Sequence, residues 1–154
     1  MDRLHAKAQF ERASRSFDKL VNNRNRDLVH YEDDVWHFFQ DCWHLKDWIK
    51  HDNQISQTYR DSVEIDANRS EALRICADLA NRSKHLNLTN RRLDANVSKR
   101  NLTINVGPPG EGSGEYNFVV LLEDGREMDA IAVAEDAMKE WRRLLGVYGV
   151  AVGS

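Results

Sequence analysis

Histidines recur at a fixed spacing in the first half of the chain, and an aspartate stands near each of them. They are His30, His37, His44 and His51, seven residues apart. Imidazole and carboxylate groups can bind a metal ion or move protons. Residues seven apart on a helix, however, lie about 10.5 Å apart along its axis, too far to share one ion. We therefore expect no metal or cofactor here, but a polar stripe with local His–Asp pairs.

A second group of candidate residues lies on one face of a predicted helix, in the phrase RICADLANRSKHLNLTNRR (74–92). The polar members of this face are Arg74, Asp78, Asn81, Arg82 and His85, and Lys84 stands between the last two. If this face is a functional site, the residues at the C-terminal end of the helix are predicted to bind an anion or RNA. Arg82 and Lys84 would hold a phosphate and Asn81 would orient it. Because histidine changes protonation near neutral pH, His85 would move a proton. The structural alternative is that these cations only oppose the negative end of the helix dipole.

A third candidate is the phrase RNRDLVHY (24–31), in which five residues separate Arg24 from His30. This phrase resembles the signature of HEPN domains, which are small helical bundles. In that signature an arginine and a polar residue are followed, after a short spacer, by a histidine. Here the motif precedes the second predicted helix, whereas in the family it comes late in the bundle.

The resemblance implies a function and a role for each residue. Many HEPN proteins are metal-independent ribonucleases of toxin or phage-defence type, and they typically dimerise with two motifs facing one cleft. By this resemblance Arg24 would stabilise charge on the phosphate undergoing attack, and Asn25 would position that phosphate. His30 would then act as acid or base.

The elements that must position these residues are mostly helices. Apolar spacings of three and four predict helices over 3–22, 27–51 and 53–66, and a further helix that Ser70 caps. The β-rich runs NLTINV (101–106) and YNFVVLL (116–122) are separated by a glycine-rich stretch, and the EDGRE turn follows them. A closing helix is expected over 129–146, after which the tail GVYGVAVGS is expected to trail off.

These elements predict a mainly α, α+β fold in a single domain, 1–154. We expect a four- to five-helix bundle whose first part spans 1–90. A small antiparallel β-hairpin or sheet, 100–128, is inserted before the closing helix, 129–146.

The helix over 27–51 has the strongest pattern in the chain. Its a/d positions are Leu28, Tyr31, Val35, Phe38, Cys42, Leu45 and Ile49. Trp36 and Trp43 stand on one flank of this seam, and Phe39 is also large and apolar. Such side chains are rarely left in water along a whole row, so the helix should be covered on more than one side. That covering would come from the bundle or from a second copy of the chain, and we predict a homodimer.

Composition excludes several classes of protein. No stretch approaches the ~18 apolar residues of a membrane span, and the first residues lack the apolar core of a signal peptide. Cys42 and Cys76 fall in apolar helical patterns, which favours buried, reduced thiols. We therefore expect a cytoplasmic protein without a membrane partner, from a bacterium or a phage-infected cell.

Charge is unevenly distributed although the net charge is only −3. Residues 82–100 contain six Lys or Arg against one Asp, whereas residues 111–140 contain nine acids against two bases. A basic edge of this kind suits a phosphate-rich partner, although most basic stretches are simply solvated.

Two functions therefore stay open. The first is HEPN-like RNA binding or metal-independent RNA cleavage. The second is a non-enzymatic module for dimerisation or protein interaction, of prophage or mobile-element origin. Whether the chain is an enzyme, and which of its two Arg/His clusters is functional, are left to the structure and to experiment.

Overall fold

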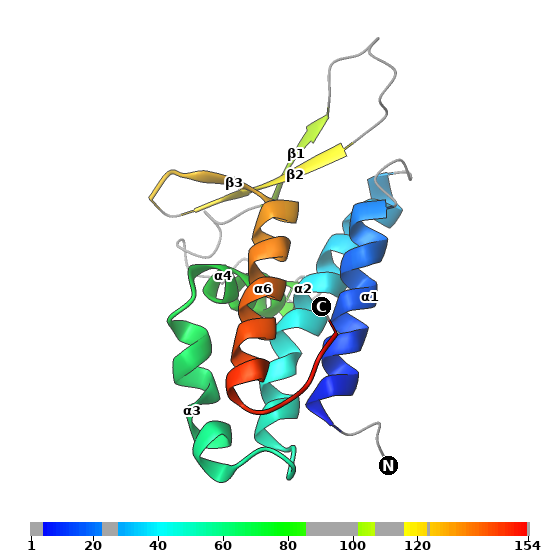
Figure 1. Cartoon of the computed structure of the whole chain (residues 1–154). Helices are drawn as coiled ribbons and strands as arrows, with labels where there is room; N and C mark the ends of the chain where they lie inside the picture. The colour runs from blue at the N-terminus through cyan, green and yellow to red at the C-terminus, as the bar shows by residue number, and fades with distance from the viewer. Residues whose placement is uncertain (1–4, 23–27, 86–101, 107–115, 123, 154) are drawn as a thin grey trace.

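The computed structural model describes residues 5–22, 28–85, 102–106, 116–122 and 124–153 (Figure 1). Within these ranges the backbone alone is described for 28–29, 82–85, 102–106, 116–119 and 121. The helices are α1 (Ala6–Asn22), α2 (Leu28–Lys50), α3 (Gln57–Asn68), α4 (Glu71–His85) and α6 (Ala130–Val147). The strands are β1 (Leu102–Val106), β2 (Tyr116–Leu121) and β3 (Glu127–Asp129). The predicted mainly α bundle, with a small sheet inserted before the closing helix, is confirmed.

Helix α2 is the centre of the bundle and packs against α1, α3, α4 and α6. All the predicted a/d residues whose side chains are described have no exposed surface: Tyr31, Val35, Phe38, Cys42, Leu45 and Ile49. Phe39 is also fully covered, and Trp43 is only 9% exposed. The buried side is therefore wider than a coiled-coil seam, as expected for a helix enclosed by several neighbours.

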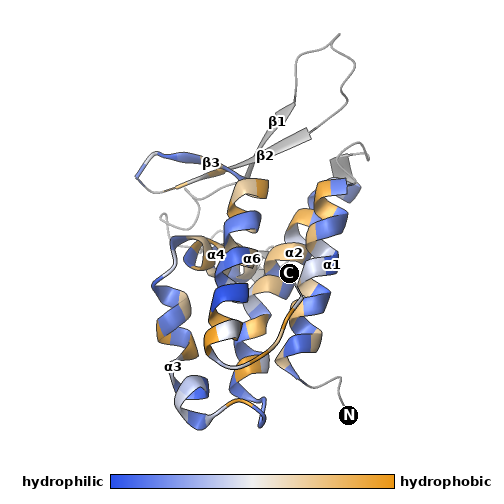
Figure 2. Ribbon diagram, in the orientation of Figure 1, coloured by the Kyte–Doolittle hydropathy of each residue, from blue (hydrophilic) through white to orange (hydrophobic). Residues whose placement is uncertain are grey.

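The helices form two groups around this centre. Figure 1 shows α1, α2 and α6 running lengthwise through the molecule, with α3 and α4 on one side. Figure 2 shows hydrophobic and hydrophilic residues alternating along α1 and α6, the pattern of helices with one face in a core. Among the described residues, no helix has both the length and the apolar character needed to cross a bilayer.

The sheet is antiparallel throughout, in the order β1-β2-β3. It lies at the end of the bundle where α6 begins (Figure 1). Strand β3 leads directly into α6, whose N-cap Asp129 accepts a hydrogen bond from the Ile131 amide at 3.4 Å. Strand β3 and α6 therefore meet without an intervening loop.

The chain after α6 folds back and does not trail off as expected. The Val150 amide donates to the Leu145 carbonyl at 2.8 Å and the Gly149 amide to the Gly146 carbonyl at 3.2 Å, which is a Schellman motif. Gly149 supplies the positive φ of 83° that the motif needs. Val150 and Val152 then pack against the core, so the glycine that suggested an open tail instead reverses the chain.

Two other helix boundaries follow local polar contacts. The Leu73 amide donates to Ser70 Oγ at 3.2 Å, which confirms the predicted cap of α4. Helix α3 begins at Gln57, later than the predicted 53. The Asp52 carboxylate accepts from the Gln54 amide at 2.9 Å, and this contact holds a turn where the helix was expected.

Helix α3 is attached to its neighbours by charged and polar side chains. Lys46 and Lys50 of α2 lie 3.0 and 2.6 Å from Glu64, and their hydrogen bonds, that of Lys50 foremost, lower the pKa of Glu64 to about 2. At the other side, the Tyr148 hydroxyl donates to Asp66 at 2.7 Å. Burial and this carboxylate raise the pKa of Tyr148 well above its usual range.

Asp52 joins the start of α1 to the loop after α2. Its carboxylate is 3% exposed and accepts from the Ala6 amide at 2.9 Å, in addition to the Gln54 amide. His5 Nδ1 lies 3.2 Å from the same carboxylate. Asp52 thus satisfies one orphan amide of α1, that of Ala6, from a position 46 residues away in the sequence.

Replacing Asp52 by alanine should lower the free energy of unfolding by about 2 kcal/mol, because the buried Ala6 amide and the partly buried Gln54 amide lose their acceptor. Urea denaturation followed by circular dichroism measures this change. Asp47→Ala is the control, since Asp47 is an exposed aspartate near the end of α2, and it should cost less than about 0.5 kcal/mol. Equal losses in the two variants would contradict the role assigned to Asp52.

Candidate functional site

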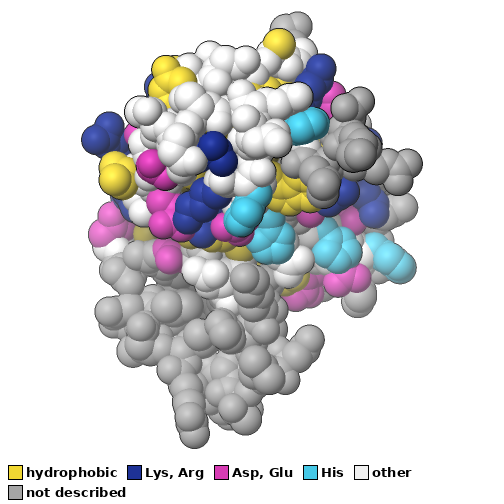
Figure 3. Space-filling model, turned by 90° about the horizontal axis from the view of Figure 1, so that it is seen from below, with side chains coloured by type: hydrophobic (Ala, Val, Ile, Leu, Met, Phe, Trp, Pro, Cys, Tyr) yellow, Lys and Arg dark blue, Asp and Glu magenta, His cyan; other side chains and the backbone are white. Residues whose placement is uncertain are grey.

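The histidine row lies on the outer side of α2. His30, His37 and His51 are exposed and His44 is half-buried. Figure 3 shows histidine side chains gathered on one side of the face seen from below. Among the described residues, no group of three His, Cys, Asp or Glu side chains is placed to hold a metal ion. The outward orientation predicted from the heptad is confirmed.

The predicted local His–Asp pairs are wrong for the middle of the row. Asp34 points toward α1, where it lies 3.2 Å from Lys19, and Asp41 accepts from Ser16 Oγ at 2.6 Å. Within the described residues His37 and His44 form no hydrogen bond or ion pair. The aspartates are drawn away because a buried helix interface must satisfy its polar groups.

The end of the row has a different contact from the one expected. His51 Nδ1 lies 2.7 Å from the Asp47 backbone carbonyl, not from its carboxylate. This contact closes the last turn of α2. It therefore gives His51 a structural role at a helix end.

The HEPN-like motif is only partly described. Arg24 and Asn25 lie outside the described residues, whereas His30 is exposed in the first turn of α2. No acidic side chain stands in that first turn. That Arg24 and Asn25 lie near His30 in the folded protein stays a prediction.

The second cluster lies at the end of α4. Asn81 is exposed, and Arg82, Lys84 and His85 belong to the last turn, where only the backbone is described. Their placement on one short helical segment is confirmed. Their approach to a common phosphate, or to His30, stays a prediction.

The division of α4 into two faces is confirmed where side chains are described. Leu73, Cys76, Leu79 and Ala80 are buried in the core. On the outward face, Arg74 and Asn81 are exposed and Asp78 is half-buried. We call the residues Arg74, Asp78 and Asn81 the outward face of α4; the last turn, which contains Arg82, Lys84 and His85, follows it along the helix.

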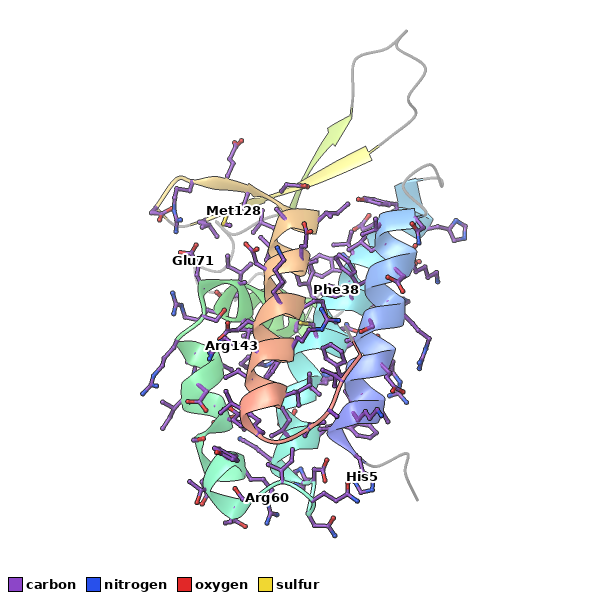
Figure 4. All side chains as sticks on the ribbon, viewed as in Figure 1. His5, Phe38, Arg60, Glu71, Met128 and Arg143 are labelled. Atoms are coloured by element: carbon purple, nitrogen blue, oxygen red, sulfur yellow. The ribbon has the colours of Figure 1, made fainter. Side chains whose placement is uncertain are left out.

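A pocket of about 460 Å³ opens where this outward face begins. It lies between α4, the end of α3 and the β2–β3 turn. Its lining residues are Asn68, Glu71, Arg74, Ile75, Ala77, Asp78, Leu122, Asp124 and Arg126. Figure 4 shows Glu71 at this corner of the molecule, near Met128 of β3 in that view. The sequence did not predict the pocket.

Arg126 joins the β2–β3 turn to the first turn of α4. Its Nη2 and Nη1 donate to the two carboxylate oxygens of Glu71 at 2.6 and 3.2 Å, and its Nε donates to Asp124 Oδ2 at 2.8 Å. The bonds to Glu71 lower the pKa of Glu71 below its usual range. The pKa of Asp124 is lowered first by the Arg126 backbone amide, which donates to Asp124 Oδ1 at 3.0 Å, and then by the Arg126 side chain. The fork geometry fixes both carboxylates at the edge of the pocket.

Arg74 is another charged residue that lines the pocket. Its Nη1 donates to the Asn68 backbone carbonyl at 2.6 Å, which ties the guanidinium to the end of α3. Ile75 and Leu122, 4% and 8% exposed, supply apolar surface between the charged groups. The pocket thus combines two guanidinium groups, three carboxylates and some apolar surface.

A second cavity, of about 520 Å³, lies between α1, α6 and the folded-back tail. Its apolar surface comes from Phe10, Phe17 and Met138. Arg142 lies over the Phe10 ring at 5.4 Å and donates from Nε to the Gly153 carbonyl at 3.1 Å. None of its lining residues belongs to either Arg/His cluster.

The thiols of Cys42 and Cys76 are buried and form no disulfide, as expected. Burial, and then a hydrogen bond with Cys42, raise the pKa of Cys76 well above its usual range. The Cys76 thiol is therefore not poised as a nucleophile.

The tryptophans of α2 are largely covered from within the chain. Trp43 carries Lys46 Nζ over its ring at 4.8 Å, and Arg12 of α1 lies over Trp48 at 5.6 Å. Among the described residues the exposed large hydrophobics are Ile65 and Val147. A homodimer stays a prediction, but covering the α2 aromatics does not require one.

Comparison with protein-family models, with curated proteins and with solved structures finds no match for this chain.

The hydrogen bonds from Arg126 to Glu71 should have a measurable effect on the titration of Glu71. Because Arg126 lowers the pKa of Glu71, the ion pair stabilises the fold above the ordinary glutamate pKa, and the stabilisation disappears as pH falls through the lowered value. In Arg126→Gln, the Glu71 carboxyl should titrate at a higher pH than in the parent protein, as measured by carbon NMR. Arg143→Gln, on α6, is the control and should leave Glu71 unchanged. A Glu71 midpoint that is the same in Arg126→Gln and in the parent would contradict this effect of Arg126.

Proposed function

We propose that this protein binds RNA along the outward face and the last turn of α4. The observation that supports this most is the continuity of the two. The face starts in a pocket beside Arg74, continues past exposed Asn81, and is followed by the turn that contains Arg82, Lys84 and His85. Arg74 and His85 are eleven positions apart, about 16 Å along a helix axis, so this length of helix suits a short stretch of nucleic acid better than one small anion.

The charge distribution supports a partner rich in phosphate at the end of α4. The last turn of α4 opens the basic segment 82–100, which contains six Lys or Arg against one Asp. Phosphate contacts from Lys and Arg supply most of the sequence-independent affinity of nucleic-acid binding. The acidic residues of 111–140 would repel phosphate, so phosphate contacts should be confined to the end of α4.

RNA cleavage without a metal ion is the second candidate, and the position of His30 favours it. His30 is exposed in the first turn of α2, directly after the segment that contains Arg24 and Asn25. The N-terminus of a helix carries orphan amides and a partial positive charge, which attract phosphate. His30 there, or His85 at the end of α4, is the group we assign to proton transfer.

RNA binding should depend on the last turn of α4. The measurement is fluorescence anisotropy of a labelled single-stranded RNA at several salt concentrations. Removing Arg82 and Lys84 together should weaken binding and reduce the slope of log affinity against log salt by about 1.4, about 0.7 for each lost phosphate contact.

The matched control is Lys7→Ala with Lys139→Ala, which removes two exposed lysines outside this face. It should leave the slope nearly unchanged. If the parent protein binds no RNA at all, the proposal is wrong, and the non-enzymatic interaction module becomes the better explanation.

Cleavage is tested separately, with the same RNA in the presence of a chelator. A general acid or base contributes about 10²- to 10⁴-fold to a rate, so His30→Ala or His85→Ala should reduce cleavage by that order. His51→Ala is the control, because His51 is exposed at the far end of the same helix as His30. Equal cleavage rates in all three variants would contradict the proposed ribonuclease activity without affecting the proposed RNA binding.

A further inference from the structure

We infer that the cavity between α1, α6 and the folded-back tail is a docking site for a short, extended segment of a partner protein. That segment would carry one bulky apolar side chain between two basic residues. The cavity belongs to α1 and α6, whereas the proposed RNA binding concerns α4, so the inference does not depend on that function. None of the residues that line the cavity was among those predicted to bind or cleave RNA.

The cavity has room and apolar surface for one large side chain. Its volume of about 520 Å³ lies within the range typical of small-ligand sites, about 300–1,000 Å³. Phe10 and Phe17 of α1 and Met138 of α6 supply its apolar surface. Phe17 is half-buried, and its ring centre lies 5.9 Å from that of Phe38 in the core. Because methionine is unbranched and flexible, Met138 would adapt to the shape of the side chain that enters.

The cavity is bounded by elements that are held in place. Arg142 of α6 lies over the Phe10 ring at 5.4 Å and donates from Nε to the Gly153 carbonyl at 3.1 Å. Val150 and Val152 pack against the core, and Figure 1 shows the chain after α6 returning toward α1. The site is therefore formed before any partner binds, which reduces the entropy lost on binding.

Three carboxylates at the cavity are left without partners. Glu11 and Asp18 of α1 and Glu135 of α6 line the cavity and are exposed. In the part of the chain that the structure describes, none of the three forms a hydrogen bond or an ion pair. They are therefore available to a cation from outside.

The bases at the cavity do not neutralise these carboxylates. Lys139 and Arg142 are the lining residues with positive charge, against three acids, and Arg142 is already engaged by Phe10 and Gly153. The cavity should therefore attract a basic segment and repel phosphate. This charge, together with the apolar surface, favours a basic peptide with an apolar anchor as the occupant.

The spacing of the carboxylates on α1 indicates an extended segment. Glu11 and Asp18 are seven residues apart, about 10.5 Å along the helix axis. In an extended chain, residues three positions apart are about 10 Å apart. Two basic residues at that spacing would each meet one carboxylate while a residue between them enters the cavity. Ser14, half-buried between the two acids, would offer its hydroxyl to the backbone of the segment.

The test uses the hexapeptide Gly-Arg-Trp-Ala-Arg-Gly with blocked ends, titrated into the whole protein and followed by amide NMR. It should shift the amides of α1 and α6 that line the cavity, in a saturable way, and bind less tightly as salt is raised. Replacing its tryptophan by serine should weaken binding about tenfold or more, because the buried apolar contact is lost. Replacing both arginines by glutamate should weaken it at least as much.

No saturable shift at these amides would overturn the inference. So would either altered peptide binding as tightly as the original, because the anchor or the charge would then play no part.

Protein variants test the carboxylates themselves. Glu11→Gln with Asp18→Asn preserves shape and removes two exposed charges, so it should weaken the hexapeptide about fivefold. The matched control, Asp33→Asn with Glu127→Gln, removes two exposed acids that do not line the cavity and should have less than about a twofold effect. Equal affinities in the two double variants would overturn the basic partner.

Ser14→Phe tests the cavity independently of charge. The added ring would fill the cavity without removing a hydrogen bond of the chain, and the hexapeptide should bind about tenfold more weakly or worse. Ala132→Phe, an exposed change on α6 outside the cavity, is the control and should bind the hexapeptide like the parent protein. Unchanged binding by Ser14→Phe would overturn the inference. If thermal unfolding shows that Ser14→Phe folds poorly, the charge variants decide.

Discussion

The fold depends on the burial of one helix. Helix α2 places its apolar residues, including Tyr31, Phe38 and Phe39, fully inside the molecule and is contacted by four other helices. Burial of large apolar side chains is the main favourable contribution to folding, at roughly 25 cal/mol per Å². Because nearly all of that surface belongs to one side of α2, the histidines of the same helix are left at its outer side, and α4 is held against it from another direction.

The polar residues of α2 then follow from this arrangement. Asp34 and Asp41 stand at the interface with α1, where they meet Lys19 and Ser16. Asp52, just after the helix, accepts from the first amide of α1. These aspartates contact polar groups within the fold, so helix packing explains their recurrence beside the histidines. The remaining candidate functional residues therefore lie at the start of α2 and on α4, not in the middle of α2.

Local signals in the sequence were sufficient for the existence and faces of the helices, although not for the start of α3. The a/d spacing predicted the buried side of α2, and Ser70 predicted the start of α4. Contacts between distant residues could not be predicted in this way. Arg126 and Glu71 are 55 residues apart and meet only because the β2–β3 turn returns to α4. The Asp124-Gly125 pair marked that turn, but nothing local indicated what it would face.

The same distinction explains the outcomes for the candidate sites. Helical spacing placed Arg74, Asp78 and Asn81 on one face correctly, because that face is set by a period of 3.6 residues. The histidine partners predicted for Asp34 and Asp41 were wrong. The observed partners come from α1, and no spacing within α2 reveals them. The HEPN-like residues Arg24 and Asn25 lie outside the described part of the chain, so their resemblance stays a prediction.

The most direct test of the central claim is the location of bound RNA on the protein. Amide NMR spectra recorded during addition of a short oligoadenylate would report this residue by residue. The account predicts that amides of α4 and of the β2–β3 turn shift, while those lining the cavity between α1 and α6 stay unchanged. Shifts confined to the α1–α6 cavity or to the middle of α2, or no shifts at all, would contradict it.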